Sequence, residues 1–227
     1  MLGIFDSGTG GYNALKVFRE HVRYENVILL TDRLNAPYGT KSRREILEIT
    51  KKNIEILKGL GARKILIACC TASTLYSRLD DEEKRISVDS LAPTAKRVRE
   101  LGVKRVALIA TERTVKEKAF PRLLPGVELS EIATQPLVKL IDRGATDTNM
   151  TSECRDYLLS IIPRIKAAHP EAIILGCTHF HSLRKTLKRE LGIPVVSSAY
   201  EGAVAFSHAI NEEIKEESRT LFLSNKY

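Results

Sequence analysis

The chain of 227 residues has no tryptophan, only two methionines and four cysteines, and no apolar run near the roughly 20 residues that a membrane-spanning helix needs. Its first residues, Met1 to Phe5, read as a strand and lack the basic segment and cleavage site of a signal peptide. We therefore expect no membrane partner and a cytoplasmic location. The 43% of hydrophobic and 28% of charged residues are ordinary for one large globular domain or two small ones.

The four cysteines are Cys69, Cys70, Cys154 and Cys177. Disulfides are uncommon in the cytosol, and no CxxC or HxxxH pair provides the ligand spacing of a zinc site, so we expect neither disulfides nor a bound metal. Each cysteine is also suited to a place in the core as a small apolar side chain. That interpretation fits Cys154 best, because it shares a helical face with four apolar residues, Leu158, Ile161, Ile162 and Ile165.

The net charge of +8 raises the question of nucleic-acid binding. The basic residues are interleaved with acidic ones, however, as where Glu45 follows Arg43 and Arg44, and Glu190 follows Arg189. Such mixing is typical of solvated helix faces, and no helix-turn-helix, zinc-finger or RNP pattern occurs. We therefore do not expect nucleic acid to be the main partner.

Short apolar runs alternate with helical stretches along the chain, which is the pattern of an α/β protein. Three runs, 65–68, 106–109 and 172–175, are apolar throughout, as in buried parallel strands. The range 42–60 is predicted to be a helix, because Ser42 and Glu45 form a capping box and apolar residues follow at helical spacing. The expected strands are 2–5, 27–30, 64–68, 85–88, 105–109, 127–132, 172–175 and 194–196.

Two segments, 64–69 and 172–177, resemble each other, since each is an apolar strand that ends in a cysteine just before a threonine and a helix start. The repetition predicts two pseudo-symmetric lobes, each a mainly parallel sheet flanked by helices, with the active site in the cleft between them. We expect residues 1–92 and 199–227 in the first lobe and residues 93–198 in the second. Open α/β sheets bind ligands at the carboxyl ends of their strands, which is where both cysteines are predicted to lie.

Cys69 and Cys177 are the strongest candidates for chemistry. The amides and dipole of a following helix stabilise a thiolate, so we expect both thiols to be acidic. Two thiols that face one cleft from opposite lobes suit a reaction that needs one base on each face of a substrate. Two buried structural thiols are the alternative, and spacing alone does not decide between the two.

Two loops that follow predicted strands carry further candidates. In FDSGTGG, residues 5–11, the glycines permit positive φ, the amides can form an anion-binding nest, and Asp6 is placed to bind a thiol or an ammonium group. The segment lacks the Gly-Lys-Ser/Thr of a P-loop. The second loop ends in Pro37-Tyr38-Gly39, a turn with an aromatic wall and a close backbone approach. Taken alone, the first loop is as readily a plain turn between a strand and a helix, and the second is more readily an ordinary surface turn.

Together, DSGTGG, PYG, the strand end ACCTAS and the strand end GCTH follow one another in the order seen in one family. The chain resembles the aspartate/glutamate racemase family along nearly its whole length, most of all the glutamate racemases. The resemblance implies two α/β lobes with the active site between them and an amino-acid substrate. It further implies racemisation without pyridoxal phosphate or metal, so no cofactor is expected, and a D-glutamate product that serves peptidoglycan synthesis.

By the same resemblance, Cys69 and Cys177 are the acid/base residues, Cys69 acting on the D-enantiomer and Cys177 on the L-enantiomer. Asp6 is expected to orient Cys69, and His179, supported by Asp142, to orient Cys177. The positions that match substrate-binding ones in the family are Asp6, Ser7, Tyr38, Gly39, Cys70, Thr71, Thr111, Thr114, Thr178 and His179.

The chain departs from the family pattern at several places. Cys70 stands where the family commonly has Asn, and Asp142 where it often has Glu. Because a thiol is a weaker hydrogen-bond donor than an amide, substrate preference is the property these changes affect most. A racemase for aspartate or another amino acid, and a binding or regulatory relative with weakened catalysis, are the alternatives. A homodimer stays open as the assembly.

Overall fold

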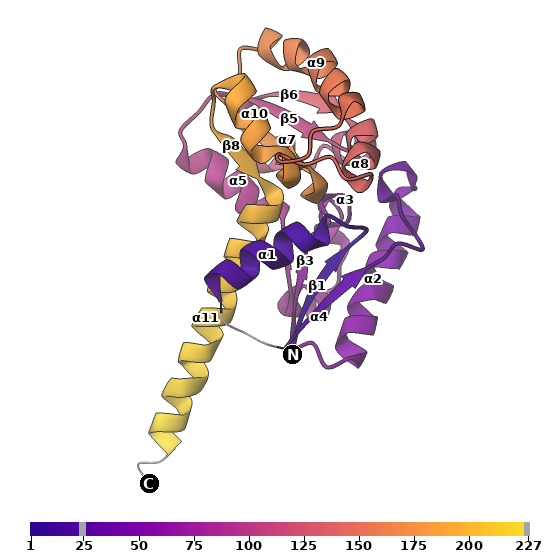
Figure 1. Cartoon of the computed structure of the whole chain (residues 1–227). Helices are drawn as coiled ribbons and strands as arrows, with labels where there is room; N and C mark the ends of the chain where they lie inside the picture. Colours follow the sequence, from indigo (N-terminus) through magenta and orange to yellow (C-terminus); the bar gives the residue numbers. More distant parts are fainter. Residues whose placement is uncertain (23–25, 225–227) are drawn as a thin grey trace.

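The computed structural model describes residues 1–22 and 26–224, with side chains as far as residue 211, and it consists of two α/β lobes stacked one above the other (Figure 1). Each lobe contains one parallel sheet of four strands, in the order β2-β1-β3-β4 in the first and β6-β5-β7-β8 in the second. The second sheet therefore repeats the first, with β7 in the place of β3. The strands are β1 Leu2–Asp6, β2 Val27–Thr31, β3 Lys64–Ile67, β4 Ser87–Asp89, β5 Arg105–Ala110, β6 Glu128–Ala133, β7 Ala172–Gly176 and β8 Val195–Ser197.

Seven of the eight predicted strands begin and end within one residue of their observed positions. The prediction for 85–88 is wrong in its first half, because Arg85 and Ile86 end helix α4, Asp81–Ile86. That helix begins with a capping box in which Asp80 and Glu83 satisfy each other's backbone amides. The cap starts a helix where the apolar pattern indicates a strand, and β4 begins only at Ser87.

The predicted helix 42–60 is confirmed as α2, Arg43–Gly59, with both hydrogen bonds of the capping box between Ser42 and Glu45. The other α-helices are α1 Gly11–His21, α3 Cys70–Ser73, α5 Leu91–Glu100, α6 Glu112–Lys116, α7 Ala119–Leu123, α8 Gln135–Asp142, α9 Ser152–Ala167, α10 Arg184–Leu191 and α11 Ser198–Ser224. Short 3-10 helices are η1 Tyr38–Thr40, η2 Tyr76–Arg78 and η3 Thr178–Leu183.

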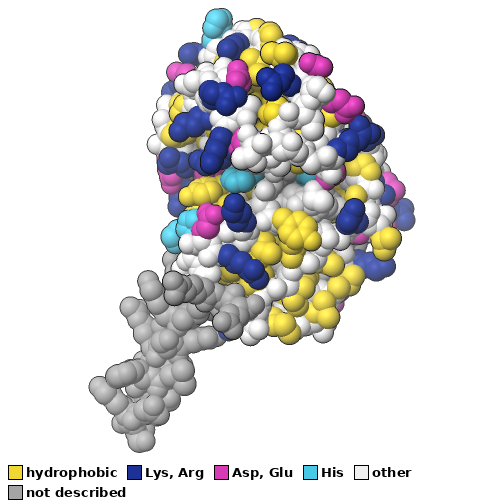
Figure 2. Space-filling model, viewed as in Figure 1, with side chains coloured by type: hydrophobic (Ala, Val, Ile, Leu, Met, Phe, Trp, Pro, Cys, Tyr) yellow, Lys and Arg dark blue, Asp and Glu magenta, His cyan; other side chains and the backbone are white. Residues whose placement is uncertain are grey.

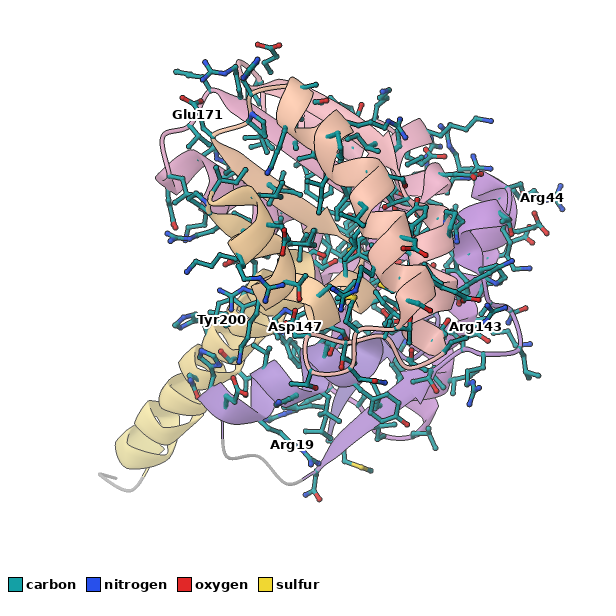
Figure 3. The ribbon with its side chains drawn as sticks, turned by 45° about the horizontal axis from the view of Figure 1, so that its top comes forward. Arg19, Arg44, Arg143, Asp147, Glu171 and Tyr200 are labelled. Atoms are coloured by element: carbon teal, nitrogen blue, oxygen red, sulfur yellow. The ribbon has the colours of Figure 1, made fainter. Side chains whose placement is uncertain are left out.

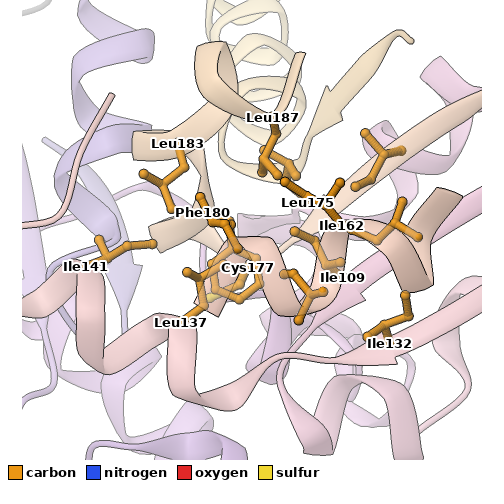
Figure 4. Packing of buried hydrophobic residues seen from close by; sticks show 14 of the residues in the cluster. Ile109, Ile132, Leu137, Ile141, Ile162, Leu175, Cys177, Phe180, Leu183 and Leu187 are labelled. Carbon is orange, nitrogen blue, oxygen red and sulfur yellow. The ribbon is translucent and has the colours of Figure 1, made fainter. Parts of the chain in front are cut away.

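Apolar side chains from the sheets and their covering helices form the cores. In the second lobe, β5 and β7 pack against α8, α9 and η3, and Leu137, Phe180 and Leu175 lie in one cluster with Cys177 (Figure 4). Cys154 is fully buried in the same cluster, so its predicted place on the apolar face of a helix is confirmed. Cys177 thus sits at the end of a strand with an apolar core beneath it.

Helix α11 leaves the second sheet directly after β8 and packs on the first lobe through Ala203, Phe206 and Ile210. Helix α5 contributes Leu91 and Ala95 to the core of the second lobe. The lobe limits near residues 92 and 199 stay a prediction, and residues 23–25 and 225–227 of the predicted first lobe lie outside the described residues.

Among the described residues, none of the helices has the length and apolar character needed to cross a bilayer. On the face shown in Figure 2, Lys and Arg side chains are spread over both lobes with Asp and Glu among them. Figure 3 shows Arg19, Arg44 and Arg143 at separate places on the outside of the molecule. The positive charge is therefore dispersed on the surface in these views.

Candidate active site

A pocket with about 450 Å³ of empty space lies where the carboxyl ends of the two sheets face each other. Its walls come from both lobes, through the loops that follow β1, β2, β3, β5, β6 and β7. Eleven of the sequence-predicted residues line it, namely Ser7, Tyr38, Gly39, Cys69, Cys70, Thr71, Thr111, Asp142, Cys177, Thr178 and His179. The other two, Asp6 and Thr114, are buried just behind the wall.

Cys69 follows β3 and is 4% exposed, so its thiol is nearly enclosed. Its Sγ lies 3.4 Å from the hydroxyl of Ser7, in the loop after β1. We expected Asp6 to orient this thiol, but the Asp6 carboxylate instead accepts hydrogen bonds from the Gly8 amide and the Thr178 hydroxyl, both at 2.9 Å. Asp6 thus bridges the two lobes beneath the pocket, and its charge reaches Cys69 only through space.

Cys177 occupies the equivalent position after β7 and is 6% exposed. Its Sγ lies 3.6 Å from Nδ1 of His179. The other ring nitrogen of His179 lies 3.2 Å from a carboxylate oxygen of Asp142, at the end of α8, and Asp142 also accepts a hydrogen bond from Thr9 of the first lobe. Cys177 therefore stands at one end of a thiol–imidazole–carboxylate chain.

The charge state of His179 follows from its neighbours. Burial favours the neutral ring, but the interaction with Asp142 and the negative charge of Asp6 outweigh it and raise the pKa of His179. The same interaction and the hydrogen bond from Thr9 outweigh desolvation at Asp142 and lower the pKa of that carboxyl. Both shifts act in the direction that favours an imidazolium beside an ionised carboxylate, next to Cys177.

Burial overturns the expectation that both thiols are acidic. Loss of contact with water, together with the charge of Asp6, raises the pKa of Cys69 to about 11. Desolvation and the nearby Cys70 likewise raise the pKa of Cys177 well above its ordinary value. The following helices do not reverse this, because α3 has only four residues and η3 is a six-residue 3-10 helix. In the free protein both groups are therefore thiols at neutral pH.

The glycines of the first loop provide space rather than positive φ, contrary to the expectation. A Cβ atom on Gly10 would lie 2.1 Å from the Thr178 hydroxyl and 2.7 Å from Nδ1 of His179. Gly10 itself has φ −57°, which any residue adopts. The close approach lets the first lobe pack directly on the GCTH segment of the second. The Gly8 amide, expected in an anion-binding nest, is bound to Asp6.

Three threonine hydroxyls meet across the lobe boundary. Thr71 lies 3.0 Å from Thr111 and 3.3 Å from Thr114, and the last two lie 2.9 Å apart. Thr111 also caps helix α6 by accepting from the Thr114 amide. The structure thus brings these three predicted residues together, with Thr71 and Thr111 at the pocket wall and Thr114 behind them.

Tyr38 positions the backbone of the second loop. Its ring is buried and tilted against Phe5, and its hydroxyl donates to Asp32 at 2.6 Å. Asn53 of α2 donates to the same carboxylate at 3.0 Å. Because the Tyr38 hydroxyl is held by Asp32, the ring and the neighbouring Gly39 backbone are the parts that face the pocket.

The sequence of this chain is similar to those of known proteins over most of its length. A family model described as Asp/Glu/Hydantoin racemase matches residues 15–205, which is most of the chain. The chain belongs to the Asp/Glu/hydantoin racemase family. A glutamate racemase of Limosilactobacillus reuteri is 31% identical to this family member over 207 residues, covering 88% of this chain and 76% of the relative. A glutamate racemase of Desulforudis audaxviator is 33% identical over 202 residues, covering 86% and 72%.

Solved structures of the family have the same fold. Glutamate racemase from Thermus thermophilus, in complex with β-chloro-D-alanine, superposes with a TM-score of 0.76 at 28% identity, over 93% of this chain and 80% of that one. Glutamate racemase from Francisella tularensis, in complex with D-glutamate, gives a TM-score of 0.83 at 23% identity, over 93% and 81%. The predicted two-lobed α/β fold is confirmed.

Cys70 has its own hydrogen-bond partners within this racemase-family site. Its Sγ lies 2.8 Å from the hydroxyl of Ser198 and accepts from Ser90 at 3.8 Å. Burial raises the pKa of Cys70 to about 12, which keeps it a neutral thiol. Cys70 lines the pocket, whereas Ser90 and Ser198 are fully buried and do not line it, so the thiol is held by groups behind the pocket wall.

Several residues that line the pocket were not predicted from the sequence, among them Ala36, Pro37, Gln135 and Val138. Gln135 and Val138 lie on α8, just after β6. The rule that ligands bind at the carboxyl ends of strands applies to β6 as it does to β3 and β7, and would have indicated this segment. Among the described residues, the structure contains no group of three His, Cys, Asp or Glu side chains arranged to hold a metal.

Proposed function

We propose that this protein is a glutamate racemase that interconverts L- and D-glutamate by a two-base mechanism. Cys69 and Cys177 are the proton-transfer groups, and neither pyridoxal phosphate nor metal takes part. One observation carries the proposal: equivalent strands of two repeated sheets place one thiol from each lobe at a single pocket. The names of the family relatives supply the substrate.

The reaction moves one proton on each face of the substrate. When L-glutamate binds, Cys177 first loses its proton to solvent; the resulting thiolate removes the α-proton, and the Cys69 thiol delivers its own proton to the opposite face. The product is D-glutamate, with Cys177 now a thiol and Cys69 a thiolate, and Cys69 then regains a proton from solvent, which restores the free protein. The imidazolium of His179, 3.6 Å from the Cys177 sulfur, offsets the thiolate charge in the reactive state.

The height of the reaction barrier limits how weakly acidic the substrate α-carbon can be when it is bound. A turnover of about 10 per second corresponds to a barrier of about 16 kcal/mol. At about 1.36 kcal/mol per pK unit, this barrier allows the effective pKa of the substrate α-carbon to exceed the solution pH by no more than about 12 units. The limit is the same for proton removal by either thiol. Hydrogen bonds to the α-carboxylate as carbanion character develops serve this purpose, and Ser7 and Thr71 are the hydroxyls placed to donate them, since the Thr178 hydroxyl donates to Asp6.

The biological role follows from the product. D-glutamate formed in the cytoplasm is a building block for peptidoglycan, so we assign the protein to the supply of cell-wall precursors. Aspartate is the competing substrate within the family, and a side-by-side measurement with L-Asp separates the two.

The direct test is a circular-dichroism assay of L-glutamate with the purified protein in EDTA and without pyridoxal phosphate. We expect the optical activity to decay to zero, and faster than with L-aspartate. Activity that requires either added cofactor would refute the mechanism, and a signal that stays constant for every amino acid in a panel would refute racemase activity altogether.

A further inference from the structure

The mechanism described above gives no role to the polar side chain of Gln135. Gln135 begins helix α8 and lines the pocket from the second lobe. Its Oε1 is fully buried and has no hydrogen-bond partner among the described residues. The amide group lies directly over Gly39 of the first lobe, where a Cβ atom would be 2.1 Å from Oε1 and 3.1 Å from Nε2. A buried amide oxygen without a partner at a ligand pocket indicates that the amide group makes a contact that only the ligand completes.

Helix geometry separates this amide from the reacting atoms. Gln135, Val138 and Asp142 occupy positions i, i+3 and i+7 of α8, so all three face the pocket from one side of the helix. At 1.5 Å per residue, Gln135 lies about 10 Å along the axis from Asp142, which contacts His179 beside Cys177. Gln135 therefore faces the end of the pocket that is remote from the Cys177 relay.

The walls near that end have the chemistry of an extended acidic side chain. Ala36, Pro37 and Val138 offer apolar surface, which suits methylene groups, and Gln135 with the Gly39 backbone offers polar groups beyond them. An amide group turns about its last bond at little cost, so either its N–H groups or its oxygen can face the ligand.

We propose that Gln135 is the residue that recognises the side-chain carboxylate of the substrate, with its Nε2 donating a hydrogen bond to that carboxylate. The residue thereby selects glutamate by the length and charge of its side chain. This inference rests on the proposed function, since it assigns one end of the same substrate. The contact is made equally before and during proton transfer, so it governs substrate binding rather than the chemical step.

The test uses Gln135→Met, which keeps the length of the side chain and removes its donors. We expect KM for L-glutamate to rise about 10- to 100-fold, the range for loss of a hydrogen bond to a charged group, with kcat changed less than about threefold. Lys139→Met, an exposed change on the same helix, is the matched control and should leave both constants unchanged. An unchanged KM in Gln135→Met would overturn the proposal.

A second variant, Gln135→Glu, tests the sign of the recognised charge. A carboxylate at this position repels the glutamate side chain but accepts a hydrogen bond from the carboxamide of L-glutamine. We expect the ratio of kcat/KM for glutamine to that for glutamate to rise about 100-fold or more over wild type. An unchanged ratio contradicts the inference while the wild-type enzyme remains a glutamate racemase. Wild-type protein without activity on glutamate would instead refute the proposed function.

Discussion

The two half-sites occupy equivalent places in the fold and differ in the partners of their thiols. Cys69, after β3, has the hydroxyl of Ser7 as its side-chain partner, at 3.4 Å. Cys177, after β7, has an imidazole at 3.6 Å, which in turn contacts the carboxylate of Asp142. The two thiols proposed to act on the two enantiomers therefore lie in unlike environments.

This difference shows that the repeated sheet and the loops contribute separately. The repeat fixes where each thiol lies, because β3 and β7 hold the same position in their sheets. The loops fix what stabilises each charge, and they cross between lobes: Asp6 of the first lobe binds Thr178 of the second. Changes in the loops should therefore unbalance the half-sites without disturbing the fold.

Loss of either thiol should have the largest effect. Cys69→Ser and Cys177→Ser replace a base by a hydroxyl that is far too weakly acidic to be ionised at neutral pH, so we expect racemisation of glutamate to fall by about 10³-fold or more in both. Thermal unfolding should change little, since each substitution is nearly isosteric. Substantial activity in one variant would show that its thiol is dispensable and that the half-sites are not partners.

Asp142→Asn should affect proton transfer at Cys177 more than proton transfer at Cys69. The amide keeps a polar contact with His179 but loses the charge that favours its protonated form, so we expect kcat/KM to fall by about 100-fold, the low end of general acid–base contributions. The equilibrium constant between enantiomers is one, so kcat/KM must fall equally in both directions.

The difference between the two thiols should appear instead in the kinetic isotope effects measured with the Asp142→Asn variant. Proton transfer at Cys177 becomes more rate-limiting, so the deuterium effect should increase for α-deuterated L-glutamate and decrease for α-deuterated D-glutamate. Arg143→Gln, next to Asp142 on the exposed surface, serves as the control. Equal changes from both enantiomers would mean that Asp142 does not act through Cys177.

The alkylation rate of Cys69 should depend strongly on pH. Burial raises the pKa of Cys69 to about 11, so the reactive thiolate is scarce at neutral pH and increases about tenfold per pH unit up to that value. We expect the rate with iodoacetamide, followed at Cys69 by peptide mass spectrometry, to be still rising at about pH 9.5. A plateau near pH 8.5, the ordinary cysteine value, would contradict the desolvated environment.

Cys154→Ala should have the smallest effect on catalysis. This thiol is fully buried in the core of the second lobe, away from the pocket. Removing its sulfur leaves a small cavity, which should lower the free energy of unfolding by about 1 kcal/mol and leave kcat and KM within about twofold. A folded but inactive variant would place Cys154 in the catalytic machinery and remove the contrast between structural and reactive thiols.

Much of the fold could be predicted because local signals and tertiary packing agree. The capping box at Ser42 starts α2, and the apolar runs before Cys69 and Cys177 are buried parallel strands. The prediction failed at Arg85 and Ile86, where the cap at Asp80 outweighs an apolar pattern that suits either structure. The local sequence pattern predicts secondary structure reliably where it fits either a helix or a strand but not both.

The site could be predicted only in part, because its energetics depend on what the fold places around each group. The sequence indicates which residues gather at the pocket, but burial, which raises the pKa of Cys69, is a property of the assembled lobes. The need for glycine at position 10 comes from Thr178, which is distant in sequence. Gln135 lacks a motif of its own and is found only from its place after β6.

Isotope incorporation in D₂O tests the central claim most directly, that two opposed thiols each serve one face of the substrate. Wild-type protein is mixed with L-glutamate in D₂O, and both enantiomers are analysed by chiral separation and mass spectrometry at early times, before product returns to substrate. We predict that D-glutamate carries deuterium at the α-carbon while the recovered L-glutamate stays protiated, because the thiol that removes the proton is not the one that delivers the new one. If the recovered L-glutamate gains deuterium as fast as D-glutamate forms, one base serves both faces, and the assignment of Cys69 and Cys177 as opposed partners is wrong.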